Sequence, residues 1–413
     1  MEQLLDIAPY VGWVYPNETV FTWSVLIAVY PYLTGLVAGA FTVSSLYQVF
    51  GFERLKPVAH LALLTSLCFM IFVPMPLLLH LGRPERAFNA TLTPHWSSAM
   101  AAFGYFASFY VVLLILETWF AYRPYIVEQA QKRKDLLGKL YQVMTLGSYD
   151  LSEKSLRYDQ KWILWLAITG IPAAHGLHGY VGFMYGSLKS REWWASDLMP
   201  VIFLFSAIIS GVSLLVVLYV ASCKLRKIPI DVACVKGLGY TIWAFIMVAI
   251  VLESLAFANL VYKGREGIEM IMEYVTGPLL IPYFLLQFAI GLMLPFLWLS
   301  YMIWRGTTGR ALVIGVTISA CLVLFSVFMM RWNVVIGGQE ISKTGKGLLF
   351  YQPMIMGKEG LIVAAILCVA PLVALLGLAR LFPPWVHGTV SSRVAAFSEQ
   401  EEVKQHLLGI GAE

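Results

Sequence analysis

The chain has 413 residues, of which 59% are hydrophobic and 13% are charged. Soluble domains carry roughly 25% charged residues, so this composition excludes an ordinary soluble protein and indicates an integral membrane protein. The formal net charge of +5 is better explained by loop topology than by nucleic-acid binding, and we expect no nucleic-acid partner. The start of the chain lacks a cationic segment before a cleavage site, so we expect an uncleaved protein inserted through its first transmembrane helix.

Nine apolar stretches are long enough to cross a membrane as helices, at about 20 residues per crossing. In chain order they cover residues 20–50, 57–80, 97–122, 161–187, 197–223, 237–262, 276–304, 310–336 and 358–381. The predicted fold class is therefore all-α, a polytopic membrane protein of about nine transmembrane helices.

The polar segments between these stretches predict the orientation. Residues 123–160 hold Lys132, Arg133 and Lys134 and are expected to form a loop with an interfacial helix, while residues 391–413 form a charged tail that is amphipathic or frayed. Nineteen of the Lys and Arg residues fall in the tail and the connections on its side, against nine on the opposite side. This asymmetry places the N-terminus outside and the C-terminus in the cytoplasm.

Five ionisable side chains lie within long apolar stretches, and the predicted topology puts all five in the outer half of the membrane. They are His80, His175, His178, Glu253 and Arg331. Charged groups in hydrocarbon are costly and usually mark a site, so we expect one polar pocket near the outer face. The alternatives are interfacial positions for His80 and Arg331, and a buried ion pair between Glu253 and Arg331.

His175 and His178 share one helix face because they are three residues apart. Pro172 precedes them by one turn and is expected to kink the helix. Imidazole can hydrogen-bond to a carbonyl oxygen and carry a proton near neutral pH, and a quinone requires both during reduction. The same pair could instead ligate haem.

Two further sets of residues carry weaker expectations. Glu117 ends the third helix beside Arg123, which favours a local interfacial pair, with a proton-entry role as the alternative. The five cysteines contain no C-x-x-C motif, so we expect no iron–sulfur cluster in this chain. No metal site is expected either.

Several short segments, spread from the first to the eighth predicted helix, match a known pattern. They are YPYLTGLVAGA at residues 30–40, LGRPER at 81–86, GFMYG at 182–186, WW at 193–194, MPVIFLFSAIISG at 199–211 and RWNVV at 331–335. They resemble the NrfD/PsrC family of integral membrane subunits. The likeness is to its longer branch, which includes the hydrogenase-2, DsrP and Hmc-type subunits and the membrane subunit of the Qrc menaquinone reductase, and it leans towards the last.

The resemblance implies an architecture of two four-helix bundles, at residues 1–187 and 197–336, with a ninth helix at 358–381 and a cytoplasmic tail at 382–413. It implies a quinone-binding subunit of an oxidoreductase complex in the bacterial inner membrane, without haem or an iron–sulfur cluster of its own. Such a subunit exchanges electrons between a periplasmic iron–sulfur partner and menaquinone at an outer-face pocket, and it has no complete activity alone. Multihaem cytochrome c and molybdopterin-like subunits are the further partners expected, and coupling to proton movement is left open.

These arguments assign roles to ten residues. His178 and Glu253 are the expected catalytic residues, and His175, His178, His80 and Arg331 are expected to bind the quinone. Outer loops rich in Arg and Trp suit a partner interface, so the expected docking residues are Arg83, Arg86, Arg191, Trp193 and Trp194. Two other classes remain open: a di-haem cytochrome b subunit that pairs His80 with His175 or His178, and a proton-linked transporter built on proline-interrupted helices.

Overall fold

The structure is a computed structural model that describes residues 21–263, 268–344, 347–385, 389–390 and 392–394. Within these residues the chain is helical, and extended pairing is confined to one isolated bridge between Ile341 and Leu348. The all-α prediction is therefore confirmed. The first 20 residues and most of the predicted tail lie outside the described residues.

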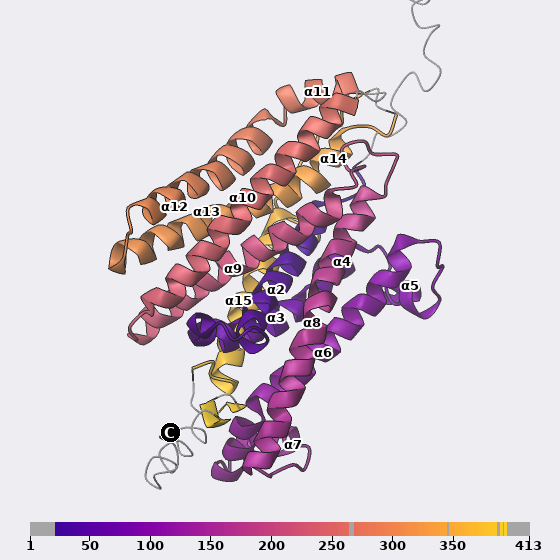
Figure 1. Cartoon of the computed structure of the whole chain (residues 1–413). Coiled ribbons are helices and arrows are strands. Elements are labelled where there is room, and N and C mark those ends of the chain that lie inside the picture. Colours follow the sequence, from indigo (N-terminus) through magenta and orange to yellow (C-terminus); the bar gives the residue numbers. More distant parts are fainter. Residues whose placement is uncertain (1–20, 264–267, 345–346, 386–388, 391, 395–413) are drawn as a thin grey trace, which may run out of the picture.

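Nine long helical segments make up the body of the protein, as far as the structure describes it (Figure 1). They are α2 (Val25–Gln48), α3 (Lys56–Phe72) continued by α4 (Pro74–His80), α6 (Ala99–Lys132), α8 (Glu153–Gly186), α9 (Met199–Arg226), α10 (Val232–Lys263), η3 (Leu280–Met293) continued by α12 (Leu294–Trp304), α13 (Gly309–Val335) and α15 (Leu361–Leu381). The short helices are η1 (Glu53–Leu55), η2 (Pro84–Arg86), α5 (Asn89–Leu92), α7 (Leu136–Met144), α11 (Ile268–Thr276) and α14 (Gly337–Glu340).

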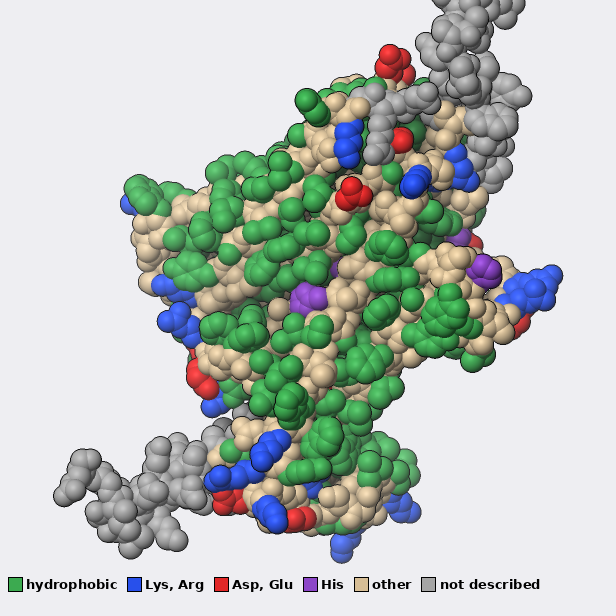
Figure 2. Space-filling view, turned by 45° about the vertical axis from the view of Figure 1, so that its right-hand side comes forward, with side chains coloured by type: hydrophobic (Ala, Val, Ile, Leu, Met, Phe, Trp, Pro, Cys, Tyr) green, Lys and Arg blue, Asp and Glu red, His purple; other side chains and the backbone are tan. Residues whose placement is uncertain are grey.

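By length and composition, eight of the described helices can cross a membrane. The remaining predicted crossing, residues 161–187, forms the greater part of α8, which Pro172 and several glycines and histidines make less apolar. α8 nevertheless packs along α2, α6 and α9 through the body of the protein (Figure 1). Hydrophobic side chains cover the middle of the face shown in Figure 2, and charged side chains gather towards its two ends. The protein is an integral, multi-pass membrane protein.

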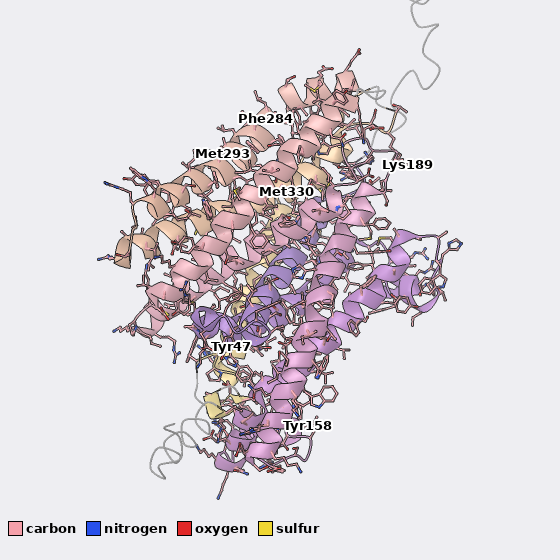
Figure 3. All side chains as sticks on the ribbon, viewed as in Figure 1. Tyr47, Tyr158, Lys189, Phe284, Met293 and Met330 are labelled. Atoms are coloured by element: carbon pink, nitrogen blue, oxygen red, sulfur yellow. The ribbon has the colours of Figure 1, made fainter. Side chains whose placement is uncertain are left out.

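The two ends of the body are named here after residues that Figure 3 labels. The Lys189 end carries Lys189, α11 and α14, and the Tyr158 end carries Tyr47 and Tyr158. The long helices run between these two ends (Figure 1). The chain therefore passes repeatedly from one end to the other.

The long helices pack in two groups of four. α2, α3, α6 and α8 form the first group, and α9, α10, η3 with α12, and α13 form the second. α2 packs against α9 across the boundary between the groups, and α15 lies against α3 and α2. One cluster of buried apolar residues contains side chains of both groups. The division into separate domains at residues 187 and 197 stays a prediction.

Glycines allow α2 and α9 to approach with their backbones in contact. A Cβ atom on Gly39 would overlap the carbonyl oxygen of Ala207 and lie 2.8 Å from the Cα of Gly211, and one on Gly211 would overlap the backbone of Gly39. Neither position can hold a larger residue without moving a backbone, because small residues set the spacing of membrane helices. The glycines of the first predicted crossing therefore serve close helix packing.

The predicted loop at residues 123–160 is shorter in the structure. α6 continues through Pro124 to Lys132, and α8 begins at Glu153, so the connection spans residues 133–152. It contains α7, whose apolar side chains Leu136 and Val143 are exposed at 83% and 72%. That exposure on a short helix confirms the interfacial helix expected within the loop.

The expected pair between Glu117 and Arg123 is wrong. Six residues apart, the two side chains leave the helix on different faces. Arg123 instead donates from Nε to Asp159 Oδ2 at 2.7 Å, from Nη1 to the carbonyl of Asp150 at 2.8 Å and from Nη2 to Ser155 Oγ at 2.8 Å. The buried Arg123–Asp159 ion pair thus joins α6, α8 and the connection between them.

Arg123→Ala is expected to lower the free energy of unfolding by about 3–5 kcal/mol, because it leaves the buried Asp159 carboxylate without a counter-charge. Thermal unfolding of the purified protein in detergent measures the effect. Lys132→Ala is the matched control, since the Lys132 side chain is 66% exposed in its pair with Glu128 and its loss is expected to change the free energy by less than about 1 kcal/mol. Equal melting temperatures for both variants would contradict the assignment.

Candidate functional site

The five ionisable residues predicted to share one pocket do not form a single cluster. Two of them meet: Arg331 Nη2 donates to His178 Nε2 at 3.0 Å and to Ser206 Oγ at 2.6 Å. His178 and Arg331 are both fully buried. The contact joins α8 of the first group to α9 and α13 of the second.

The Arg331 guanidinium has neutral surroundings. Its carbon lies 3.9 Å from the centre of the Phe203 ring, and Nη1 donates to Met330 Sδ at 3.0 Å. Among the described residues no carboxylate pairs with it. A Cβ atom on Gly35 would lie 3.3 Å from His178 Cε1, so the glycine on α2 leaves room for the imidazole. The result is a buried positive centre held by dipoles and an aromatic face.

Glu253 has a different partner from the one considered for it. Gln287 Nε2 donates to Glu253 Oε2 at 2.8 Å, and Asn333 Nδ2 donates to Gln287 Oε1 at 2.8 Å. The alternative of a direct Glu253–Arg331 ion pair is therefore wrong, because a chain of two amides from η3 and α13 occupies the carboxylate instead. The other Glu253 oxygen has no hydrogen-bond partner among the described residues.

A cavity opens beside this carboxylate, between α9, α10, η3 and α13. Its volume is about 810 Å³, counting the open mouth, which is within the range of small-molecule sites. Glu253, Gln287 and Asn333 provide polar groups on its wall. Much of the rest is apolar or aromatic, from Trp193, Met199, Ile202, Ala256, Phe257, Leu260, Tyr283, Met330 and Val334. Such a cavity suits a flat, mostly apolar ligand with a few polar atoms.

The helix η3 that supplies Gln287 and Tyr283 is a π-helix of 14 residues. π-Helical segments are rare and frequently occur at functional sites. Figure 3 labels Phe284 and Met293 of this helix, together with Met330 on α13. Sequence reasoning missed Gln287 and Asn333 because it considered ionisable residues alone. A signal was present, since Gln287 interrupts an otherwise apolar run from Phe284 to Met293.

His175 and His80 lie away from this cavity. His175 Nδ1 is 2.7 Å from the carbonyl oxygen of Ile171, and its Nε2 is 3.3 Å from Thr42 Oγ1. His80 Nδ1 is 2.8 Å from Glu359 Oε2. Partial burial raises the pKa of Glu359, but hydrogen bonds from Ser24 and His80 outweigh it and hold that pKa below its ordinary value. The placement of both histidines favours structural roles.

The alternatives of haem ligation and transport gain no support from this geometry. His178 Nε2 accepts the hydrogen bond from Arg331, so its lone pair is not free to bind a haem iron. Transport folds carry interrupted helices at corresponding positions of their two halves. Here the α3–α4 break falls in the second helix of the first group, whereas the π-helix η3 falls in the third helix of the second group.

Of the five expected docking residues, two are exposed. Arg83 and Arg86 lie on the surface, whereas Arg191 is 8% exposed and Trp194 is 1% exposed. Arg191 Nη1 donates to the carbonyl oxygens of Gly338 and Ile341, each at 3.1 Å. The expectation that Arg191 and Trp194 face a partner is wrong, because this loop folds back onto the chain's own residues 333–341.

Trp193 also turns inwards. Its Nε1 donates to the carbonyl oxygen of Asn333 at 3.1 Å, and its ring forms part of the cavity wall. Trp194 stacks on Trp23 with ring centres 5.2 Å apart. The two tryptophans therefore fix the rim of the cavity rather than an outer interface.

Most of the chain is similar to known membrane proteins. The family described as Polysulphide reductase, NrfD, matches residues 14–342. The selenate reductase C subunit of Mesobacillus selenatarsenatis is 28% identical over 321 residues, which cover 76% of this chain and 73% of that protein. The putative C-type membrane subunit of a dimethyl sulfoxide reductase from Halobacterium salinarum is 26% identical over 231 residues, 55% of this chain and 50% of that protein.

A third relative is the Hdr-like menaquinol oxidoreductase integral membrane subunit of Archaeoglobus fulgidus. It is 23% identical over 232 residues, which cover 55% of this chain and 49% of that protein. The match thus spans about half the length of two of the three relatives and most of the other.

Proposed function

Because the chain belongs to the NrfD polysulphide reductase family, we propose that it is the quinone-binding membrane subunit of an oxidoreductase complex. In this proposal it exchanges electrons between an iron–sulfur partner and menaquinone, and the quinone ring occupies the cavity beside Glu253. The relatives named above are membrane subunits of reductases or of a menaquinol oxidoreductase, which supports a role as membrane anchor of such a complex.

The cavity beside the Glu253 carboxyl carries this proposal. Reducing a quinone to a quinol adds two electrons and two protons, so a group that exchanges protons must reach a quinone oxygen. Glu253 is held through Oε2 by Gln287 at 2.8 Å, which leaves its other oxygen for a proton transfer. Hydrogen-bonded placement of a general acid or base is the geometry that such transfer needs.

The His178–Arg331 centre has a different role in this proposal. Neither side chain lines the cavity, but Met330, which contacts Arg331, does. A buried cation stabilises negative charge that develops nearby during a reaction. We therefore assign Arg331 and His178 as positioning residues that favour the reduced quinone, in place of the direct contact expected for His178.

Electrons must come from outside the chain, and the Lys189 end is the proposed dock. Arg83 and Arg86 are exposed there beside Phe88, Leu92 and Trp96, which are 68%, 76% and 71% exposed. Arg and Trp are enriched at binding hot spots. The partner is proposed to be a periplasmic iron–sulfur subunit, accompanied by multihaem cytochrome c and molybdopterin-like subunits.

A cavity-filling variant tests the location of the quinone. Ala256 lines the cavity, so Ala256→Trp is expected to weaken binding of a photoreactive menaquinone analogue about tenfold or more, equivalent to about 1.4 kcal/mol. Leu255→Trp is the matched control, because the neighbouring Leu255 side chain is 53% exposed. Photolabelling measured by mass spectrometry gives the affinity. Unchanged labelling in Ala256→Trp would place the quinone elsewhere.

The proposed orientation has a separate test in cells. In a variant without native cysteines, Lys189→Cys is expected to react with a membrane-impermeant thiol reagent in intact cells that lack the partner, and Lys132→Cys is not. Both side chains are exposed and lie at opposite ends of the body (Figures 1 and 3). Protection of the Lys189→Cys site by the partner would locate the dock. The reverse labelling pattern would place the cavity on the cytoplasmic side.

A further inference from the structure

The first helical group contains a set of buried oxygen atoms that no described residue satisfies. Three are on α2 and five are on α6: Tyr30 Oη, Ser45 Oγ, Gln48 Oε1, Tyr110 Oη, Glu117 Oε1, Glu117 Oε2, Thr118 Oγ1 and Tyr122 Oη. Buried polar atoms are almost always hydrogen-bonded, to protein or to ordered water. Since the described part of the protein supplies no partner to these eight, internal water is the partner that the fold allows.

Glu117 is the chemically distinctive member of the set. It is fully buried and both carboxyl oxygens lack a protein partner among the described residues. Arg123, the nearest cation along α6, is committed to Asp159 at 2.6 Å. A buried carboxylate without a counter-charge is very costly, and such a group takes up a proton instead. Glu117 therefore rests as the neutral acid.

The oxygen atoms follow the interior of the group rather than one surface. α2 and α6 lie diagonally across it, each packed against α3 and α8, and the rings of Phe41 and Tyr110 approach to 5.6 Å across the middle. Along α6, Tyr110 and Glu117 are seven residues apart and so share a face about 10 Å apart in depth. Tyr122 continues the series towards the Tyr158 end.

We propose that Glu117 is a proton-exchange site, served by water along the interior of the first helical group from the Tyr158 end. The carboxylic acid gives its proton to a water molecule of this row and regains one from the next, with no electron transfer. This site goes beyond the quinone proposal, which concerns the second group, and it does not depend on that proposal.

Titratable groups on the neighbouring helices are compatible with this role. His60 on α3 is half-buried, and its ring lies 5.8 Å from that of Tyr122, which places a further proton carrier towards the Tyr158 end. Asp159 on α8 is neutralised by Arg123. Neither provides a fixed charge that would hold Glu117 in one protonation state.

Infrared spectroscopy of the purified full-length protein in light and heavy water tests the site. The carboxyl stretch of a protonated, buried Glu117 is expected above the carboxylate region, and it is expected to shift within minutes in heavy water. Glu117→Gln is expected to abolish that band and keep the helical amide signal. Glu253→Gln identifies the band of the other buried carboxyl, so the two are told apart.

A second variant keeps the test decisive if Glu117→Gln fails to fold. Tyr110→Phe retains the ring and removes one hydroxyl of the row, and it is expected to slow the exchange of the Glu117 band. Labelling of the Glu117 peptide by dicyclohexylcarbodiimide, which attacks protonated carboxyls in apolar surroundings, is a further expected result. A Glu117 band that does not exchange in heavy water, or no Glu117 adduct, would overturn the proposal while leaving the quinone cavity untouched.

Discussion

Replacing Glu253 by glutamine is expected to lower quinone-linked turnover of the assembled complex by about 10²–10⁴-fold, the usual contribution of a positioned proton donor or acceptor. Glutamine has nearly the same shape and can accept the hydrogen bond that Gln287 Nε2 donates to Oε2 at 2.8 Å, but it cannot exchange a proton with the quinone. Quinone binding is therefore expected to change much less than turnover. Steady-state kinetics with a soluble menaquinone analogue separate the two.

Glu269→Gln is the matched control for this experiment. Glu269 lies on α11 at the same end of the protein, and its side chain is exposed, so its turnover is expected to equal that of the native protein. Full turnover in an assembled Glu253→Gln complex would rule out the catalytic role. Loss of assembly would instead show that the carboxylate is needed for the contact between α10 and η3.

Arg331→Met is expected to lower kcat about tenfold or more, which corresponds to about 1.4 kcal/mol of lost transition-state stabilisation. The methionine fills similar apolar space, and removing a buried charge that has only neutral partners is often tolerated by the fold. The variant leaves His178 Nε2 and Ser206 Oγ without the donor they have at 3.0 and 2.6 Å. KM is expected to change less than kcat, because Arg331 does not line the cavity.

Two comparisons distinguish this electrostatic role from a purely structural one. Arg331→Lys keeps the positive charge and is expected to recover part of the lost kcat. Arg310→Met removes an exposed arginine from the first turn of the same helix, α13, and is expected to leave kcat unchanged. If Arg331→Lys were as slow as Arg331→Met despite normal assembly, charge would not be the property that matters.

Much of the fold could be predicted from the sequence because membrane crossing imposes a strong compositional pattern. The predicted crossing at residues 197–223 corresponds to α9 at Met199–Arg226. The prediction ended α6 too early because Pro124 and the charged residues after it suggest a break. The helix persists because the buried Arg123 is bound by Asp159, 36 residues further along the chain, and a contact of that kind cannot be read from local pattern.

The candidate site was predicted less well, for a geometric reason. Counting residues along a helix gives the depth of a side chain, but its neighbours depend on how each helix is rotated against the others. His178 and Arg331 do meet, whereas Glu253 turns towards Gln287 instead. Trp194 was assigned to an outer interface because loop tryptophans often bind partners, and its burial depends on a chain reversal over residues 333–341.

The crossing at Gly39 and Gly211 has a mechanical consequence. Where two helices touch backbone to backbone, so closely that an added Cβ would overlap the Ala207 oxygen, no side chains lie between them to act as rollers or springs. The two helical groups are pinned at that point, and tilting one against the other would separate the helices or drive their backbones together. Any charge movement through this protein must therefore rely on side chains, water and a local change in the π-helix within a rigid frame.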